Sequence, residues 1–69
     1  MNHTKVKETL KHLRIALKDE LKQDNFYKKA AEVAKEEGLS SAAEFFRNAA
    51  KDEKRHAAEI ENILRALSS

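Results

Sequence analysis

The side chains in this sequence that could carry out metal chemistry are two glutamates and one histidine. Glu53 and His56 form a Glu-x-x-His pair, and residues three positions apart lie on the same face of an α-helix. Glu20 stands far upstream, at a place where the surrounding pattern predicts an apolar residue. Carboxylates and imidazole are ligands for divalent ions such as iron and manganese. We interpret the three residues as half of a two-metal site.

The composition predicts that helices hold these residues in place. The chain has 69 residues, with no cysteine, no proline and a single glycine, Gly38. It is rich in alanine, leucine, glutamate and lysine, which favour helices. A chain of this length forms one small domain with a marginal core of its own. The lack of cysteine excludes disulfide bonds and thiolate metal sites.

The distribution of charge and apolar residues limits the classes of partner. No apolar run approaches the length that spans a membrane, and the first residues are too charged for a secretion signal, so we expect a soluble cytoplasmic protein. The net charge is only +2, but residues 1–18 hold five basic residues against one acidic residue. A basic helix end can contact nucleic acid or an acidic partner. No aromatic or glycine-rich recognition feature accompanies it, so a solvated face is the simpler interpretation and nucleic acid is not expected.

A first helix is predicted over about residues 4–37, with Thr4 as its candidate N-cap. Gly38 fits the left-handed position that follows a helix C-terminus, and the turn is expected at residues 38–40. Apolar residues recur along this helix mostly at spacings of three and four, which predicts one buried stripe. The stripe consists of Val6, Leu10, Leu13, Leu17, Leu21, Tyr27, Ala31 and Ala34.

A second helix is predicted over about residues 41–67. Ser40 or Ser41 is its candidate N-cap, and Glu44 stands three residues after Ser41, as a capping box requires. Because the turn is short, the two helices must pack antiparallel. The stripe of this helix consists of Ala42, Phe45, Phe46, Ala49, Glu53, His56, Ile60, Ile63, Leu64 and Leu67.

The antiparallel hairpin brings the three polar residues to one level. Glu20 lies 18 residues before Gly38, or about 27 Å along a helix at about 1.5 Å per residue. Glu53 and His56 lie 15 and 18 residues after Gly38, or about 22 and 27 Å. Asp24 also falls on the stripe of the first helix, where it would accept a hydrogen bond from a metal ligand or from Tyr27, or reach solvent.

A two-helix hairpin leaves its apolar stripe half open to water, which predicts pairing with a second copy about a two-fold axis. The dimer would be a four-helix bundle that gathers two copies each of Glu20, Glu53 and His56. This is the ligand set of a di-iron or di-manganese carboxylate bundle. Two carboxylates about 4 Å apart repel by roughly 4 kcal/mol at an effective dielectric constant of about 20. Two divalent ions would neutralise all four carboxylates.

A longer pattern resembles the rubrerythrins, a family within the ferritin-like superfamily. The matching stretch covers roughly residues 17–64 and needs no gap. Glu-x-x-His alone is a weak signal, but additional residues at fixed offsets make the resemblance fairly specific. The residues that carry it are Glu20, Tyr27, Ala30, Ala31, Ala34, Glu37, Gly38, Ala43, Phe46, Ala50, Glu53, His56 and Ala57.

The resemblance implies a ferritin-like four-helix bundle with metal ligands at Glu20, Glu53 and His56. It also implies that Tyr27 lies near the metals as a hydrogen-bonding group, which makes it a candidate catalytic residue. The implied activity is that of a di-iron oxidoreductase, in which Fe(II) is oxidised by dioxygen or hydrogen peroxide, as in a ferroxidase or a peroxide scavenger. We expect two iron ions per dimer, with manganese as an alternative because the same ligands suit it.

The chain departs from the family pattern in three ways. It has one hairpin where rubrerythrins usually have two, so a homodimer or a higher oligomer would complete the site. It lacks the cysteine-ligated rubredoxin-like domain, so a peroxidase would need a separate electron donor protein. Gln23 stands where one family hairpin has a second glutamate. Two alternatives stay open: a metal-binding or purely structural dimerisation module without turnover, and a helical module that binds nucleic acid or a partner through its basic first helix.

Overall fold

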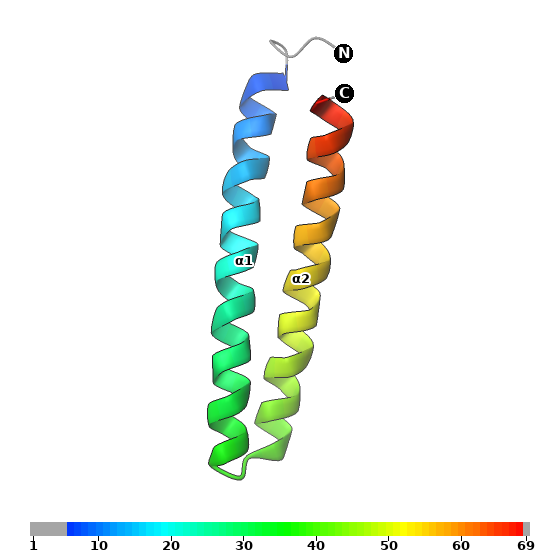
Figure 1. The fold of residues 1–69 in the computed structure, drawn as a ribbon. Coiled ribbons are helices and arrows are strands. Elements are labelled where there is room, and N and C mark those ends of the chain that lie inside the picture. The colour runs from blue at the N-terminus through cyan, green and yellow to red at the C-terminus, as the bar shows by residue number, and fades with distance from the viewer. Residues whose placement is uncertain (1–5, 69) are drawn as a thin grey trace.

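The computed structural model describes residues 6–68, which form two long antiparallel helices (Figure 1). Helix α1 spans Lys7–Glu36 and helix α2 spans Ser40–Ser68. The two helices run side by side as a rod of 53 × 14 × 12 Å. The expected all-α helical hairpin is therefore confirmed. Val6 occupies the N-cap position of α1 without a side-chain cap, and Thr4, the expected N-cap, lies outside the described residues.

The turn between the helices is closed by backbone hydrogen bonds around Gly38. The Gly38 N–H donates to the Lys35 carbonyl at 3.1 Å, and the Leu39 N–H donates to the Ala34 carbonyl at 2.9 Å. This pair of bonds is the Schellman motif, which requires a left-handed residue after the helix. Gly38 supplies it with a φ of 76°, at no steric cost because glycine has no Cβ.

The second helix begins one residue earlier than expected, which changes its cap. The carbonyl of Leu39 accepts a helical hydrogen bond from the N–H of Ala43 at 2.9 Å, so Leu39 takes the N-cap position. Ser40 and Ser41 therefore lie inside the first turn, and the prediction that one of them caps the helix was wrong. The Schellman motif leads directly into α2, which leaves no residue between turn and helix for a serine cap.

Small residues line the contact between the two helices. Ala31 and Ala34 on α1 and Ala43, Ala50 and Ala57 on α2 are all at most 6% exposed. The three alanines of α2 are seven residues apart, which is the repeat that keeps one seam of a helix facing its partner. The distance between packed helices depends on the side chains at their contact, so this alanine seam lets α1 and α2 approach closely.

Most large apolar side chains lie outside this seam. Leu10 is the only apolar residue larger than alanine that is buried among residues 6–68. The sequence pattern places Leu21, Phe45 and Ile63 in the apolar stripes, but all three are exposed, so that part of the prediction was wrong. A contact between two helices covers only a narrow strip of each, so large residues at its edges stay open. The exposed ones are Ile15, Leu21, Phe26, Val33, Leu39, Phe45 and Ile63.

Candidate metal centre

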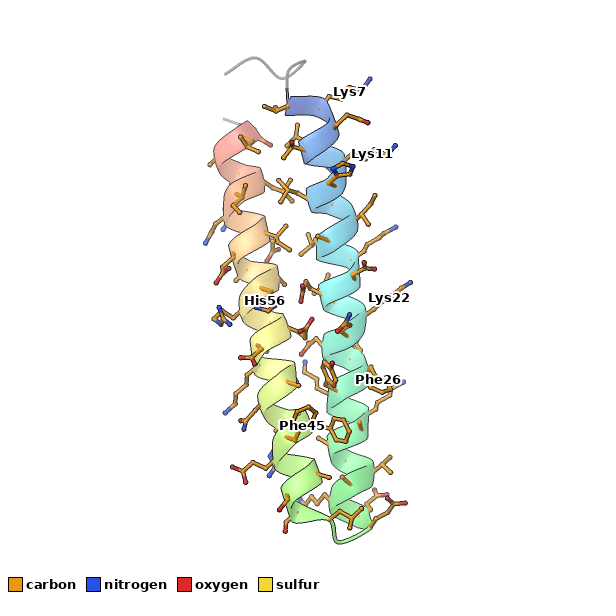
Figure 2. The ribbon with its side chains drawn as sticks, turned by 180° about the vertical axis from the view of Figure 1, so that it is seen from behind. Lys7, Lys11, Lys22, Phe26, Phe45 and His56 are labelled. Carbon is orange, nitrogen blue, oxygen red and sulfur yellow. The ribbon has the colours of Figure 1, made fainter. Side chains whose placement is uncertain are left out.

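The three residues expected at one level do meet, about midway along the hairpin. His56 Nδ1 on α2 lies 3.3 Å from Glu20 Oε2 on α1 and 3.9 Å from Glu53 Oε1 one turn earlier on α2. One potential ligand atom from each residue lies within 4.8 Å of the other two. Figure 2 shows His56 near the middle of α2. We call Glu20, Glu53 and His56 the carboxylate–histidine cluster.

The cluster is shielded on one side and open on the other. The side chains of Glu53 and Glu20 are 15% and 23% exposed, whereas that of His56 is 40% exposed. The carboxylates are therefore largely withdrawn from water. Charge interactions are stronger at such a partly buried place than in water. The imidazole stays within reach of an ion or a small molecule that approaches from the open side.

The two carboxylates of the cluster disfavour each other's charge. A hydrogen bond with the Glu20 carboxyl raises the pKa of Glu53, and partial burial and like-charge repulsion from Glu20 act in the same direction. His56 opposes this effect and lowers the pKa of Glu53, while Asp52 raises it slightly. Without a cation, the folded hairpin thus holds two acidic groups closer together than their charges favour.

The two nitrogens of the His56 ring face different groups. Nδ1 faces Glu20 and Glu53, whereas Nε2 lies 3.4 Å from Nη2 of Arg55. Arg55 also donates from Nη1 to Glu59 Oε1 at 3.0 Å. The nitrogen aimed at the carboxylates is the one that would bind a shared metal ion. Sequence reasoning missed Arg55, because a residue next in sequence to a ligand is expected to point about 100° away around the helix.

An aromatic row crosses both helices on the same side as the cluster. It consists of Phe26, Tyr27, Phe46 and Phe45, whose successive ring centroids are 5.5, 6.2 and 5.4 Å apart. Tyr27 follows Glu20 by seven residues and Phe46 precedes Glu53 by seven, and seven residues are about two helical turns. Phe26 and Phe45 form the ends of the row and are 62% and 63% exposed. Both are labelled in Figure 2, at similar heights on α1 and α2.

The candidate catalytic residue Tyr27 lies in this aromatic row, half-buried. Its ring stacks on Phe46 with an interplanar angle of 26°. Among residues 6–68, the structure gives no hydrogen bond between its hydroxyl group and the cluster. Tyr27 therefore lies on the same side of the hairpin as the carboxylate–histidine cluster, and its role in chemistry stays a proposal.

The environment of Asp24 differs from those expected, which were a hydrogen bond from a metal ligand or Tyr27, or exposure to solvent. It is 7% exposed, and its Oδ2 pairs with Lys28 Nζ at 2.9 Å. Its Oδ1 is buried and has no hydrogen-bond donor within the described part of the chain. Asp24 is therefore separate from the carboxylate–histidine cluster, and it does not simply reach solvent. The sequence pattern places it on the stripe but does not show that Lys28, one turn later, folds back over it.

The comparison with protein families matches residues 11–69 to the rubrerythrin model. The chain belongs to the rubrerythrin family. Comparisons with curated proteins and with solved structures gave no match. The family assignment supports a protein of the di-iron type, and it agrees with the all-helical fold.

The cluster of this rubrerythrin-family chain fits a divalent ion chemically. Carboxylate oxygens and an imidazole nitrogen suit iron and manganese, and a cation between Glu20 and Glu53 would remove the repulsion that raises the pKa of Glu53. One hairpin supplies two carboxylates and one imidazole, which is half of the set that holds two metals in a four-helix bundle. Gln23 is exposed and adds no further carboxylate.

In the described residues, no helix combines the length and apolar character needed to cross a membrane.

Proposed function

We propose that two copies of this hairpin form a four-helix bundle that binds two iron ions and oxidises Fe(II) with dioxygen or hydrogen peroxide. The observation that supports this proposal most is the meeting of Glu20, Glu53 and His56, whose ligand atoms lie within 4.8 Å of one another. They come from two helices and converge on a side of the hairpin that is open. Glu20, Glu53 and Nδ1 of His56 would hold the metal.

The exposed aromatic row supports the homodimer. Phe26 and Phe45 are mostly open to water at the ends of the row, and large exposed apolar patches mark interaction sites. Because the row lies on the same side as the cluster, pairing through it about a two-fold axis would bring two clusters together. The bundle would then have four carboxylates and two imidazoles, the full ligand set for two metals.

The residues of the cluster would prepare the site for electron transfer to a small oxidant. Bound iron would supply the redox chemistry: two electrons from two Fe(II) ions, together with two protons, would reduce one hydrogen peroxide molecule to two water molecules. The four glutamates would balance the charge of two divalent ions, and each His56 would supply one nitrogen ligand. Continued peroxidase turnover would require a separate electron donor protein, whereas a ferroxidase would be resupplied with Fe(II).

Rapid oxidation of Fe(II) tests the activity. Protein loaded anaerobically with Fe(II) is expected to form ferric iron after addition of hydrogen peroxide or dioxygen, well above the rate in buffer, as followed by absorbance.

Tyr27→Phe should keep the metal content but slow this oxidation by about tenfold, because a positioned proton donor typically contributes at least that much. An unchanged rate in Tyr27→Phe would remove Tyr27 from the chemistry.

A metal-binding module without turnover is the second candidate. Gln23 favours it, since a symmetric dimer lacks the second glutamate that one family hairpin carries at this position. If a dimer fully loaded with iron oxidises Fe(II) no faster than buffer does, the protein is a metal-binding module without turnover.

A further inference from the structure

A basic groove lies between the two helices, nearer to the turn than the cluster. It has a volume of about 540 Å³. Its floor includes Ala31 and Ala50, both buried in the seam. Basic residues of both helices dominate its rims, against two acidic lining residues, Asp24 and Glu32. The basic residues are Lys28, Lys29, Lys35, Arg47, Lys51 and Lys54.

The basic groove opens on a different side of the hairpin from the cluster. None of Glu20, Glu53 and His56 lines it, nor does any residue of the aromatic row. Around α2, Lys54 follows Glu53 by about 100° in one direction, whereas His56 lies about 60° from Glu53 in the other. Pairing of two copies through the cluster and the aromatic row would therefore leave the basic groove on the outside of the bundle.

The groove continues toward the turn with the same charge. A second hollow of about 230 Å³ shares Lys35 and Arg47 with it and reaches Gly38 and Ser40. The hollow ends at the N-terminus of α2, whose first turn has no acidic residue. A helix N-terminus carries partial positive charge, so the basic groove and this hollow together form one electropositive surface. Along α1, the stretch from Asp24 to Lys35 alone is about 16 Å long.

Asp24 adds a specific feature to the floor. Asp24 lines the groove, and its Oδ1 is covered by surrounding atoms and has no donor in the described part of the chain; a buried acceptor without a donor is costly. Its Oδ2 is held by Lys28, so one of the six cations is already neutralised. A ligand that fits this groove must therefore combine negative charge with apolar surface, and a ligand that displaces the cover over Oδ1 gains a hydrogen bond by donating to it.

We propose that the basic groove binds an acidic amphipathic helix of a partner protein. The apolar stripe of such a helix would rest on the Ala31–Ala50 floor, its carboxylates would face the lysines and Arg47, and one amide or hydroxyl would donate to Asp24. Helices bind in grooves of this kind through one apolar stripe. A nucleic acid fits less well, because its sugar-phosphate backbone has no apolar stripe to rest on the Ala31–Ala50 floor and, in the described part of the chain, no aromatic ring lines the groove for base stacking. This surface is independent of metal binding.

Binding of designed peptides to the full-length protein tests this proposal. The probe is a labelled peptide of roughly 15 residues with leucine and alanine on one helical stripe, glutamates beside it and one glutamine within it. A peptide of the same composition in scrambled order and a single-stranded oligonucleotide are the comparison ligands. The amphipathic peptide should bind most tightly at low ionic strength, and added salt should weaken it.

Two charge-reversal variants provide the matched comparison. Arg47→Glu with Lys51→Glu places two acidic residues on the groove rim and should weaken peptide binding by at least about tenfold. Lys18→Glu with Lys22→Glu changes the net charge equally at exposed positions of α1; Figure 2 shows Lys22 pointing away from α2. Both pairs are four residues apart, so each variant replaces one repulsive helical pair with another, and the second should bind the peptide within about twofold of the parent.

Three results would overturn the proposal: no binding of the amphipathic peptide, equal binding of the scrambled peptide or the oligonucleotide, or equal weakening by both double variants. Equal binding of the oligonucleotide would indicate a general polyanion surface. Circular dichroism of both double variants confirms that the helices are retained. Metal content is measured on the same samples and should not change, so failure here is distinct from failure of the iron site.

Discussion

Replacing Glu53 with glutamine is expected to lower the affinity of the protein for Fe(II) by at least about 100-fold, because loss of groups that merely support a ligand already costs 10–100-fold. Glutamine keeps the size and helix preference of glutamate but provides no charged oxygen beside Glu20 and His56. His56→Ala should have the same effect. Metal affinity is measured by anaerobic titration, and helix content by circular dichroism.

The stability of the metal-free protein gives a second signature of the same substitution. The hydrogen bond with Glu20, burial and repulsion raise the pKa of Glu53, so its ionised form is less favourable in the folded hairpin than in the unfolded chain. Glu53→Gln removes that ionised form and should leave the metal-free protein at least as stable as the parent near pH 7. If the role of Glu53 is purely structural, the metal-free Glu53→Gln variant should be less stable than the parent.

Glu61→Gln is the matched control for Glu53→Gln. Glu61 lies on the same helix, is exposed and is not part of the cluster, so its substitution should change neither the affinity nor the stability. Equal Fe(II) affinity of both variants would contradict the assignment of Glu53 as a ligand.

The second large effect concerns assembly: Phe45→Glu is expected to weaken the dimer by at least about 100-fold. Burying a phenylalanine side chain contributes about 1.5–3 kcal/mol, and a two-fold axis uses each residue twice. The loss of about 3–6 kcal/mol corresponds to a factor of 100 or more in the dissociation constant. The charge of glutamate in the aromatic row of the partner copy adds to this cost. Sedimentation over a range of protein concentrations measures the change.

Leu39→Glu separates this effect from a general loss of apolar surface. Leu39 is also a large exposed apolar residue, but it lies at the turn, away from the aromatic row. Its substitution should leave the dimer intact. If Phe45→Glu stays dimeric, the copies do not pair through the aromatic row, and the way in which the site is completed would have to be revised.

Sequence spacing was sufficient to predict the hairpin and the meeting of three distant side chains. The distances of Glu20, Glu53 and His56 from Gly38 determine their level along an antiparallel pair, because the rise per residue of a helix is constant. The left-handed Gly38 followed from the steric freedom of glycine. These features depend on local geometry or on one short connection, and both can be deduced from sequence.

The features that the sequence did not reveal depend on how the two helices are rotated about their axes. The apolar pattern correctly placed Ala31 and Ala34 inside, but it also placed Leu21 there. On α2 it selected Ala42 and Ala49, whereas the residues that form the seam are each one position later or lie outside the pattern: Ala43, Ala50 and Ala57. The basic groove combines Lys35 with Arg47 and Lys51 from the other helix, whereas charge counting along the chain drew attention to residues 1–18. Such surfaces exist only after two helices are placed side by side.

The most direct test of the central claim is the iron content per chain of protein sized in solution, after purification without chelator and anaerobic loading with Fe(II). We expect a dimer with about one iron per chain, which means two metals in each four-helix bundle. A dimer without iron, or iron that is retained equally by Glu53→Gln, would contradict that claim.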